Sequence, residues 1–230
     1  MTLLDAAVRN NAAWCAAVVA SHGRRSTWTD GLWACAERSP PLFPDAVTLS
    51  PTTTEADVVE AIDVTSPGAS VKDSFARLDL RDAGFTVLFD AEWIHLEPGR
   101  HDGGGVCGDP WQAIDAASLP GWVRSWDGGG TGLFLPGLLT QPGVRLLAAG
   151  PLQRPTAGAA VQADAEVLGV SNLFARDHDL PTAWRGCLAL LAPEGWPVVG
   201  YETGHDLAAA RSVGARPLGP LRIWIARVPR

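Results

Sequence analysis

The chain has 230 residues and a formal net charge of -7, and 47% of its residues are hydrophobic. This composition is typical of a water-soluble globular protein with one large or two small domains. The acidic balance argues against a nucleic-acid surface, which needs clustered Lys and Arg. The sequence contains no apolar run of about 20 residues and no apolar leader. We therefore expect no membrane association and, by default, a cytoplasmic location.

Residue usage singles out a few positions. Of the 18 basic side chains only Lys72 is a lysine, Tyr201 is the lone tyrosine, and asparagine is scarce, with Asn172 in the second half. A coding background that favours Arg over Lys makes such residues informative, although chance explains each of them equally well. The cysteines at 15, 35, 107 and 187 are far apart and form no C-x-x-C pair, which favours reduced, buried thiols over a zinc or disulfide framework.

The start of the chain predicts a helix, a connection, a strand and a second helix. Apolar residues at helical spacing predict a packing helix over residues 3–22, ended by Gly23. We interpret residues 22–44 as an irregular connection and residues 46–50 as a short strand. Thr52 followed by Glu55 is a capping-box pattern, which predicts the start of the next helix.

The longest predicted strand of the first half is FTVLFDAEWIHLEP. A period of two places Asp90 and Glu92 on one face and Trp93 on the other. Apolar surroundings raise the pKa of a carboxyl group, so either acid is a candidate general base, and a solvated face or a salt bridge is the alternative. Upstream, Lys72 either directs a cation toward an anionic substrate or belongs to a helix start over residues 72–74.

Residues 98–132 predict a break, because two Gly-rich runs flank the short amphipathic piece WQAIDAASLPGWV. No strand precedes either run, so neither predicts a phosphate-binding loop. We place the boundary between an N-terminal α/β part, residues 1–110, and a second part, residues 111–230, at this break. The segments VRLLAAG and TAGAAVQAD then predict an antiparallel pair, and no internal repeat is visible in the sequence.

The stretch from Val167 to Ile225 predicts strand, helix, strand, helix and strand with short links. Short β-branched runs bounded by Gly or Pro mark the strands. Asp206 is positioned to cap the second helix, and Gly214 stands where a left-handed residue ends it. The pattern predicts a mixed α/β core.

This layout resembles that of the GNAT acyltransferases over residues 133–227. The resemblance implies a mixed, mostly antiparallel sheet flanked by helices, here with an extra N-terminal α/β layer. It also implies acetyl-CoA as co-substrate, bound where the fourth and fifth strands of the fold splay apart. The strand from Val170 to Ala175 would lie along the pantetheine arm, and the helix from Pro181 to Leu191 would face the pyrophosphate. The implied cofactor contacts are Ser171, Asn172, Leu173, Ala175, Thr182 and Ala183.

The sequence departs from the family pattern at two places. The run RDHDLP stands where the family has a glycine-containing pyrophosphate loop, and it puts Asp177 and Asp179 near a helix start that otherwise attracts anions. Ala210 stands where the family has a tyrosine as general acid.

The predicted reaction is acyl transfer to a small-molecule amine. Glu202 and Tyr201 end a strand of an open α/β sheet, where ligands tend to bind, so they are a candidate base and a candidate proton donor. A network that caps the loop is the alternative for both. We predict Glu202, Asp90, Glu92 and Tyr201 as catalytic residues and Lys72, Trp93 and Arg222 as substrate contacts. We predict neither metal nor nucleic acid, and a homodimer is left open.

Three further hypotheses remain open. A GNAT-like scaffold that has lost CoA binding would serve as a ligand-binding or regulatory protein, and a different reaction on the same scaffold would use Lys72 with the paired carboxylates. The pairs His101-Asp102, His178-Asp179 and His205-Asp206 would be ligands in a metal hydrolase, although their spacing matches no established metal motif.

Overall fold

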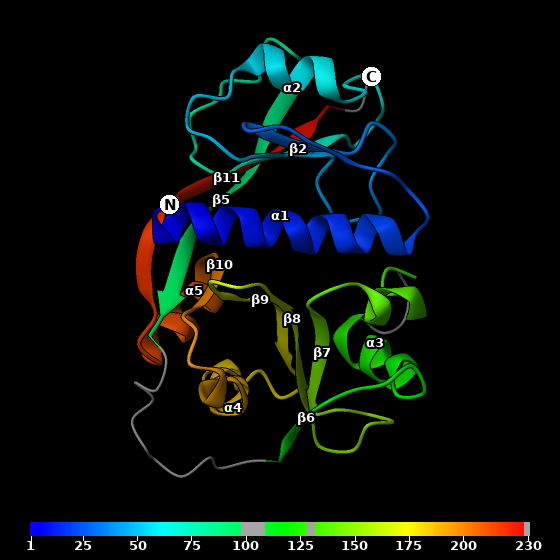
Figure 1. Cartoon of the computed structure of the whole chain (residues 1–230), viewed down its shortest axis with the longest axis vertical. Coiled ribbons are helices and arrows are strands. Elements are labelled where there is room, and N and C mark those ends of the chain that lie inside the picture. The colour runs from blue at the N-terminus through cyan, green and yellow to red at the C-terminus, as the bar shows by residue number, and fades with distance from the viewer. Residues whose placement is uncertain (98–108, 128–131, 228–230) are drawn as a thin grey trace.

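The computed structural model describes residues 1–97, 109–127 and 132–227. Within them, one sheet of eleven strands has the order β1-β2-β3-β4-β11-β5-β10-β9-β8-β7-β6 (Figure 1). The strands are β1 (Thr27–Trp28), β2 (Leu32–Ala34), β3 (Ala46–Thr48), β4 (Ser70–Asp73), β5 (Phe85–Leu96), β6 (Trp111–Ala113), β7 (Val144–Ala149), β8 (Ala157–Ala163), β9 (Leu168–Ala175), β10 (Val198–Glu202) and β11 (Arg216–Ala226). The helices are α1 (Leu3–Ser21), α2 (Glu55–Ala61), α3 (Leu119–Asp127), α4 (Leu180–Leu191) and α5 (Gly204–Ser212), with 3-10 turns η1 (Pro136–Thr140) and η2 (Ala192–Glu194).

The sheet repeats one topology twice. Strands β1, β2 and β3 are successively antiparallel and β3 pairs in parallel with β4; strands β7, β8, β9 and β10 do the same in the second half. A helix, α2 or α4, connects the two strands of each parallel pair. The sequence has no visible repeat, but the strand topology is repeated.

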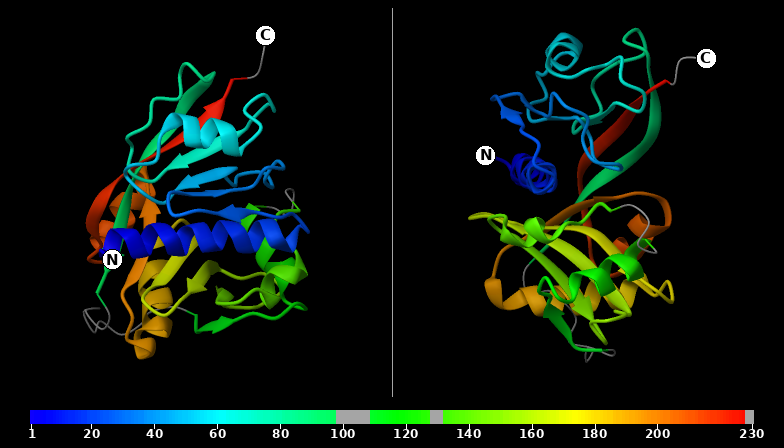
Figure 2. Two further views of the ribbon diagram at one scale, coloured as in Figure 1. Left: turned by 45° about the horizontal axis from the view of Figure 1, so that its top comes forward. Right: turned by 90° about the vertical axis from the view of Figure 1, so that its right-hand side faces the viewer.

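The two halves exchange their last strands. β5 follows the first half in sequence but pairs with β10 of the second, whereas β11 follows the second half and pairs with β4 of the first. β5 and β11 pair with each other along nearly their whole length. Figure 1 and the left view of Figure 2 show these long strands running beside both halves. The predicted parts 1–110 and 111–230 therefore share one sheet, although the boundary itself stays a prediction.

Helix α1 crosses the middle of the molecule between the two halves (Figure 1). The Thr2 side chain caps it by accepting a hydrogen bond from the Asp5 N–H, and the Asp5 carboxylate accepts one from the Thr2 N–H. Its buried residues pack in one core with Trp33 of the first half and Trp122 of the second. The core under α1 thus belongs to both halves.

Two larger, separate cores lie on the other face of the sheet. α4 and α5 cover one of them in the second half, where Trp184 and Leu188 are fully buried. α2 covers the other in the first half, around Val58 and Trp224. None of the helices among the described residues is long and apolar enough to cross a membrane.

The predicted fold class is confirmed, and several details differ. The order β9, α4, β10, α5, β11 matches the prediction, and Gly214 has the left-handed φ of 100°. The connection over 22–44 contains β1 and β2, which are too short to give a periodic signal. Asp206 is not the cap of α5, because the helix begins at Gly204 and Asp206 lies inside its first turn.

Two further expectations in the first half are wrong. The capping box of α2 uses Thr54 and Asp57, which have the same spacing as the predicted Thr52 and Glu55. Lys72 does not start a helix, because it lies on β4 and pairs there with Val47 and Ile223.

Candidate functional site

The parallel strands β9 and β10 separate soon after they meet. They pair only at Leu168 with Val198 and at Gly169 with Val199. Beyond that point β9 bulges, because two residues, Asn172 and Leu173, lie opposite one residue of β8. Asn172 has a φ of 53°, a left-handed conformation that asparagine tolerates. Bulges of this kind redirect side chains near active sites, so the polar segment is a β-bulge and is also compatible with a role in a site.

A cavity of about 270 Å³ lies at this separation, and we call it the central cavity. Because Tyr201 and Glu202 are consecutive on β10, their side chains leave opposite faces of the sheet, and the gap between the strands gives both access to the cavity. Its walls come from α1, the loop 42–44, β4, α3, β9, β10 and α5. They include Asn11, Trp14, Cys15, Phe43, Lys72, Trp126, Ser171, Asn172, Leu173, Tyr201, Glu202 and Asp206.

Lys72 places a buried amine in the wall of the central cavity. Its side chain is almost fully buried, its Nζ donates to Asn11 Oδ1 at 2.5 Å, and Nζ lies 4.4 Å from the centre of the Tyr201 ring. Burial lowers the pKa of Lys72, whereas interactions with Tyr201 and Cys15 raise it, and the net shift is upward.

Glu202 is the acid of the cavity that is suited to proton transfer. Burial raises its pKa to about 8, and repulsion by Asp206 adds to the shift. A carboxyl group that titrates near neutral pH is an efficient general base or acid. The charge of Asp206 also gives this part of the cavity a negative potential.

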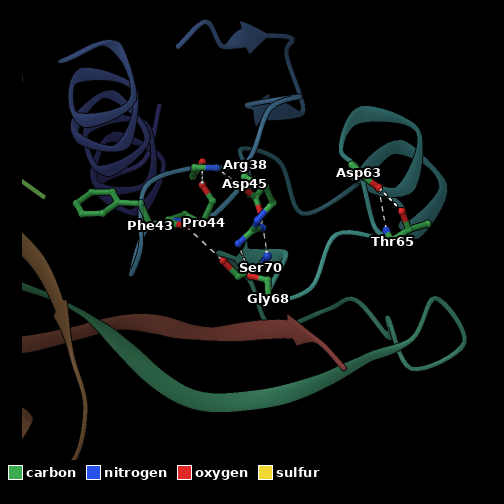
Figure 3. A network of polar contacts seen from close by, with 9 residues as sticks. Arg38, Phe43, Pro44, Asp45, Asp63, Thr65, Gly68 and Ser70 are labelled. Carbon is green, nitrogen blue, oxygen red and sulfur yellow. Dashed lines mark hydrogen bonds and ion pairs between the residues drawn. The ribbon is translucent and has the colours of Figure 1, made fainter. Parts of the chain in front are cut away.

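A polar network fixes the loop that closes one wall (Figure 3). Arg38 forms an ion pair with Asp45 and donates to the Gly68 carbonyl at 2.6 Å. The Asp45 carboxylate also accepts from the Ser70 N–H at 2.9 Å, and the Asp45 N–H donates to the Ser70 carbonyl. Burial raises the pKa of Asp45, and these bonds oppose the shift. The network ties the loop carrying Phe43 to β4, the strand that carries Lys72.

A second cavity, of about 210 Å³, shares Lys72, Tyr201 and the loop 42–44 with the first, and we call it the apolar cavity. Leu88 and Phe89 of β5 lie at its edge and are partly exposed, and Leu42 is 76% exposed. The remaining walls are largely aliphatic and include Pro40, Pro44, Ile223 and Ile225. Lys72 therefore stands between a polar space and an apolar one.

The first turn of α4 is the predicted site for a pyrophosphate, and its N–H groups are already used. Thr182 N–H donates to the Asp179 carboxylate at 3.1 Å, and Leu180 N–H donates to the His178 carbonyl at 2.9 Å. Pro181 has no N–H, and the N–H of Ala183 donates to the Asp179 carbonyl. A phosphate would have to displace these bonds.

The space beside this turn is acidic. A cavity of about 190 Å³ there is lined by Ala175, Thr182 and Ala183 together with Asp109, Asp177 and Asp179. Trp111 packs on Gly186 of α4, where an added Cβ would lie 2.1 Å from the indole nitrogen. The carboxylates repel phosphate and the N–H groups are occupied, so the residues at α4 do not fit the pyrophosphate of CoA.

The other predicted site residues lie away from the central cavity. Asp90 forms an ion pair with Arg222 at 2.7 Å, and this bond lowers the pKa of Asp90. Glu92 forms an ion pair with Arg211 at 2.6 Å. Trp93 is fully buried beneath Tyr201, 5.4 Å between ring centres, and its indole N–H donates to the Ser74 carbonyl.

The structure thus brings Lys72, Tyr201, Glu202, Ser171, Asn172 and Leu173 together and leaves Asp90, Glu92, Trp93 and Arg222 outside the cavity. Sequence reasoning missed Asn11 and Cys15, because both lie inside a helix with an ordinary packing pattern. The scarcity of asparagine was a signal that pointed to Asn11 as well as to Asn172.

Metal ligation receives no support from the described residues, which contain no cluster of three His, Cys, Asp or Glu able to hold an ion. Within the predicted pairs, Asp179 caps α4 and Asp206 lies in the first turn of α5. His101, Asp102 and Cys107 lie outside the described residues. Cys15, Cys35 and Cys187 are free and buried, as expected.

The sheet order, the separated pair β9 and β10, and the helix between these strands define the GNAT fold. Solved structures share it over nearly the whole chain. A GCN5-related N-acetyltransferase from Kribbella flavida is 17% identical, with a TM-score of 0.59 and coverage of 97% of this chain and 96% of the other.

Two further structures support the same fold. One from Novosphingobium aromaticivorans, described as a GNAT-family acetyltransferase, is 12% identical with a TM-score of 0.56, and the coverage is 94% and 99%. A GCN5-related N-acetyltransferase-like protein from Streptococcus suis is 11% identical with a TM-score of 0.56, and the coverage is 93% and 94%. No family model and no curated protein matches the sequence. At these identities the likeness establishes the fold, and it includes the N-terminal half that the sequence pattern left out.

Proposed function

We propose that the protein transfers an acyl group from a thioester donor to a small-molecule amine at the central cavity. The observation that carries this proposal is Glu202, a carboxyl group with a pKa of about 8 beside the separation of β9 and β10. An amine acceptor arrives as an ammonium ion and needs a base before it can attack a thioester carbonyl. The shared fold favours acyl transfer, and Glu202 is the residue that would serve as its base.

Several residues of the cavity have roles in this proposal. Glu202 accepts the proton of the acceptor's ammonium group, directly or through a water molecule. Backbone N–H groups of the bulge at Ser171 and Asn172 polarise the acyl carbonyl. Tyr201 is the candidate donor of a proton to the departing thiolate, and the second proton that the attacking nitrogen loses restores the phenol. Asn11 holds Lys72 in place.

Acetyl-CoA is the donor that the family resemblance implies, and we test it alongside a shorter thioester. Because the first turn of α4 does not fit the pyrophosphate, we infer that a donor is held by its acyl and pantetheine end. The same observation favours a second function, a ligand-binding or regulatory protein on a GNAT scaffold that has lost CoA binding.

Thiol release from acetyl-CoA and from acetyl-pantetheine, measured with a panel of amines, separates the two functions. Acyl transfer predicts amine-dependent thiol release that Glu202→Gln reduces by roughly 10²- to 10⁴-fold, the usual contribution of a general base. Glu194→Gln is the matched control, because Glu194 pairs with Arg145 at the surface. Amine binding without thiol release from either donor would support the ligand-binding function instead.

A further inference from the structure

Among the described residues, no acid neutralises the buried ammonium group that Lys72 forms when it is protonated. Of the three N–H donors of its ammonium group, one is used by Asn11, a neutral partner, and the Tyr201 ring lies against the same group. Within residues 1–97, 109–127 and 132–227, no carboxylate forms an ion pair with Lys72, whereas five arginine–carboxylate ion pairs occur elsewhere in these ranges. Burying a cation without a counter-charge is costly. A bound anion would supply the counter-charge that the ammonium form of Lys72 lacks.

The surroundings of Lys72 restrict the anion that would fit. The wall of the central cavity also carries Glu202 and Asp206, and the Asp206 carboxylate repels a phosphate or any other group with two negative charges. A carboxylate with a positive group next to it suits both Lys72 and these acids. A zwitterion such as an α-amino acid has this arrangement, with its carboxylate toward Lys72 and its ammonium group toward Glu202.

The apolar cavity supplies the third requirement. It begins at Lys72 and Tyr201, which it shares with the central cavity, and its walls are mostly aliphatic and aromatic. A molecule bound by its carboxylate at Lys72 can place a side chain of several carbon atoms there. Burial of such a side chain against Ile223 and Phe89 adds binding free energy in proportion to the apolar area covered.

We propose that the acceptor is an α-amino acid with an apolar side chain, whose carboxylate binds Lys72 and whose side chain enters the apolar cavity. This inference rests on the proposed acyl transfer for its description of the ligand as an acceptor. The carboxylate site itself is independent of turnover, and the experiment measures the two separately.

Calorimetric titration of the full chain with three ligands of one carbon skeleton tests the site. L-Leucine has both charged groups, 4-methylpentanoate lacks the amine, and 3-methylbutylamine lacks the carboxylate. We expect L-leucine to bind best, 4-methylpentanoate to bind measurably, and 3-methylbutylamine not to bind at millimolar concentration. Equal binding of L-leucine and 3-methylbutylamine, or no binding of any of the three, would overturn the proposal. All three ligands are tested on the unaltered chain, so the result does not depend on whether a variant folds.

Variants then locate the carboxylate. Lys72→Met removes a charge-assisted hydrogen bond, and we expect L-leucine to bind about tenfold more weakly or worse. Arg216→Met, which removes one positive charge from an exposed position of β11, is the control and should bind L-leucine as the unaltered chain does. Unchanged binding in Lys72→Met would contradict the assignment.

A second pair of variants tests the apolar cavity. Leu88→Asp places a charge at the edge of this cavity, whereas Leu190→Asp places one on α4, outside both cavities. We expect Leu88→Asp to weaken L-leucine binding and to leave glycine binding unchanged, and Leu190→Asp to change neither. If Leu88→Asp lowers the affinity for L-leucine and for glycine equally, the apolar cavity does not bind the side chain.

Thiol release separates this inference from the proposed function. Binding of L-leucine without acyl transfer would support the carboxylate site and contradict the proposed acyl transfer. Acyl transfer to 3-methylbutylamine as fast as to L-leucine would support the proposed acyl transfer and contradict the proposal that the acceptor is an amino acid.

Discussion

The two halves of the sheet contain the same parallel strand pair joined by a helix, but they fill the gap between the strands differently. β3 and β4 pair at Ala46 with Val71 and at Val47 with Lys72 and then separate, as β9 and β10 do. In the first half the Thr48 hydroxyl accepts a hydrogen bond from the Ser74 N–H at 2.8 Å, and both residues are buried. In the second half the gap is a cavity.

The topology leaves a gap between the parallel strands in both halves. The side chains at the gap determine whether it is filled or forms a cavity. A threonine closes one gap, whereas a bulge and two residues at the end of β10 leave the other open. The closed half still contributes, because Lys72 extends from β4 into the cavity of the open half. The two halves have the same strand topology, and they contribute different side chains to one cavity.

The largest stability effect that we expect in the open half is the pH dependence caused by Glu202. Its pKa is about 8 in the fold and near 4.5 when solvated. The folded state therefore binds more protons between these values, and the free energy of unfolding falls as pH rises from about 4.5 to about 8. Glu202→Gln should remove this dependence, which we expect to be on the order of 2–4 kcal/mol.

Urea unfolding at several pH values measures the effect. The difference in unfolding free energy between Glu202→Gln and the unaltered chain should grow in favour of the variant up to about pH 8 and then level off. A constant difference across this range would show that Glu202 titrates normally and would remove its role as the base.

Thr48 in the closed half and Ser171 in the open half give the next effect. Thr48→Val leaves the buried Ser74 N–H without its partner, and we expect a loss of about 1–3 kcal/mol in unfolding free energy. Ser171→Ala faces the cavity and should cost less than about 0.5 kcal/mol. Urea unfolding compares them. Equal losses would mean that both gaps are equally well packed and that the contrast between the halves is wrong.

The helix caps of α2 and α4 allow a further comparison of the two halves. Asp179→Ala removes the cap of α4, costs about 1 kcal/mol and frees the Thr182 N–H, whereas Thr54→Ala removes the cap of α2 at a similar cost. In the unaltered chain we expect acetyl-CoA and acetyl-pantetheine to act with similar apparent affinity. Asp179→Ala should improve acetyl-CoA alone, and Thr54→Ala should change neither donor. A strong preference of the unaltered chain for acetyl-CoA would show that the pyrophosphate has a site elsewhere.

Local signals in the sequence were sufficient for the second half of the fold. Turn residues and short β-branched runs defined β9, α4, β10, α5 and β11. The exchange of β5 and β11 was not predictable, because pairing between distant strands leaves no trace in local periodicity. The same limit applies to the duplication of the topology, which the two halves share without a repeated sequence.

The candidate site was partly predictable for a related reason. Lys72 and Tyr201 were singled out by their rarity, and Glu202 by its place at the end of a strand. All three line the central cavity, and their functions stay predictions. Asp90 and Glu92 were chosen from strand periodicity, which cannot show that Arg222 and Arg211 lie beside them.

The smallest effect concerns the exchanged strands, where Asp90 of β5 pairs with Arg222 of β11 at the surface. Asp90→Asn should lower the unfolding free energy by less than about 1 kcal/mol, because exposed ion pairs are screened by water and salt. Backbone pairing and the buried side chains of β5 and β11, rather than this ion pair, hold the halves together. Urea unfolding at low and high salt tests this, and a salt-insensitive loss of several kcal/mol would contradict it. A loss of acyl transfer in the same variant would move the role of base from Glu202 to Asp90, and with it the site from the gap in the second half to the strands that the two halves exchange.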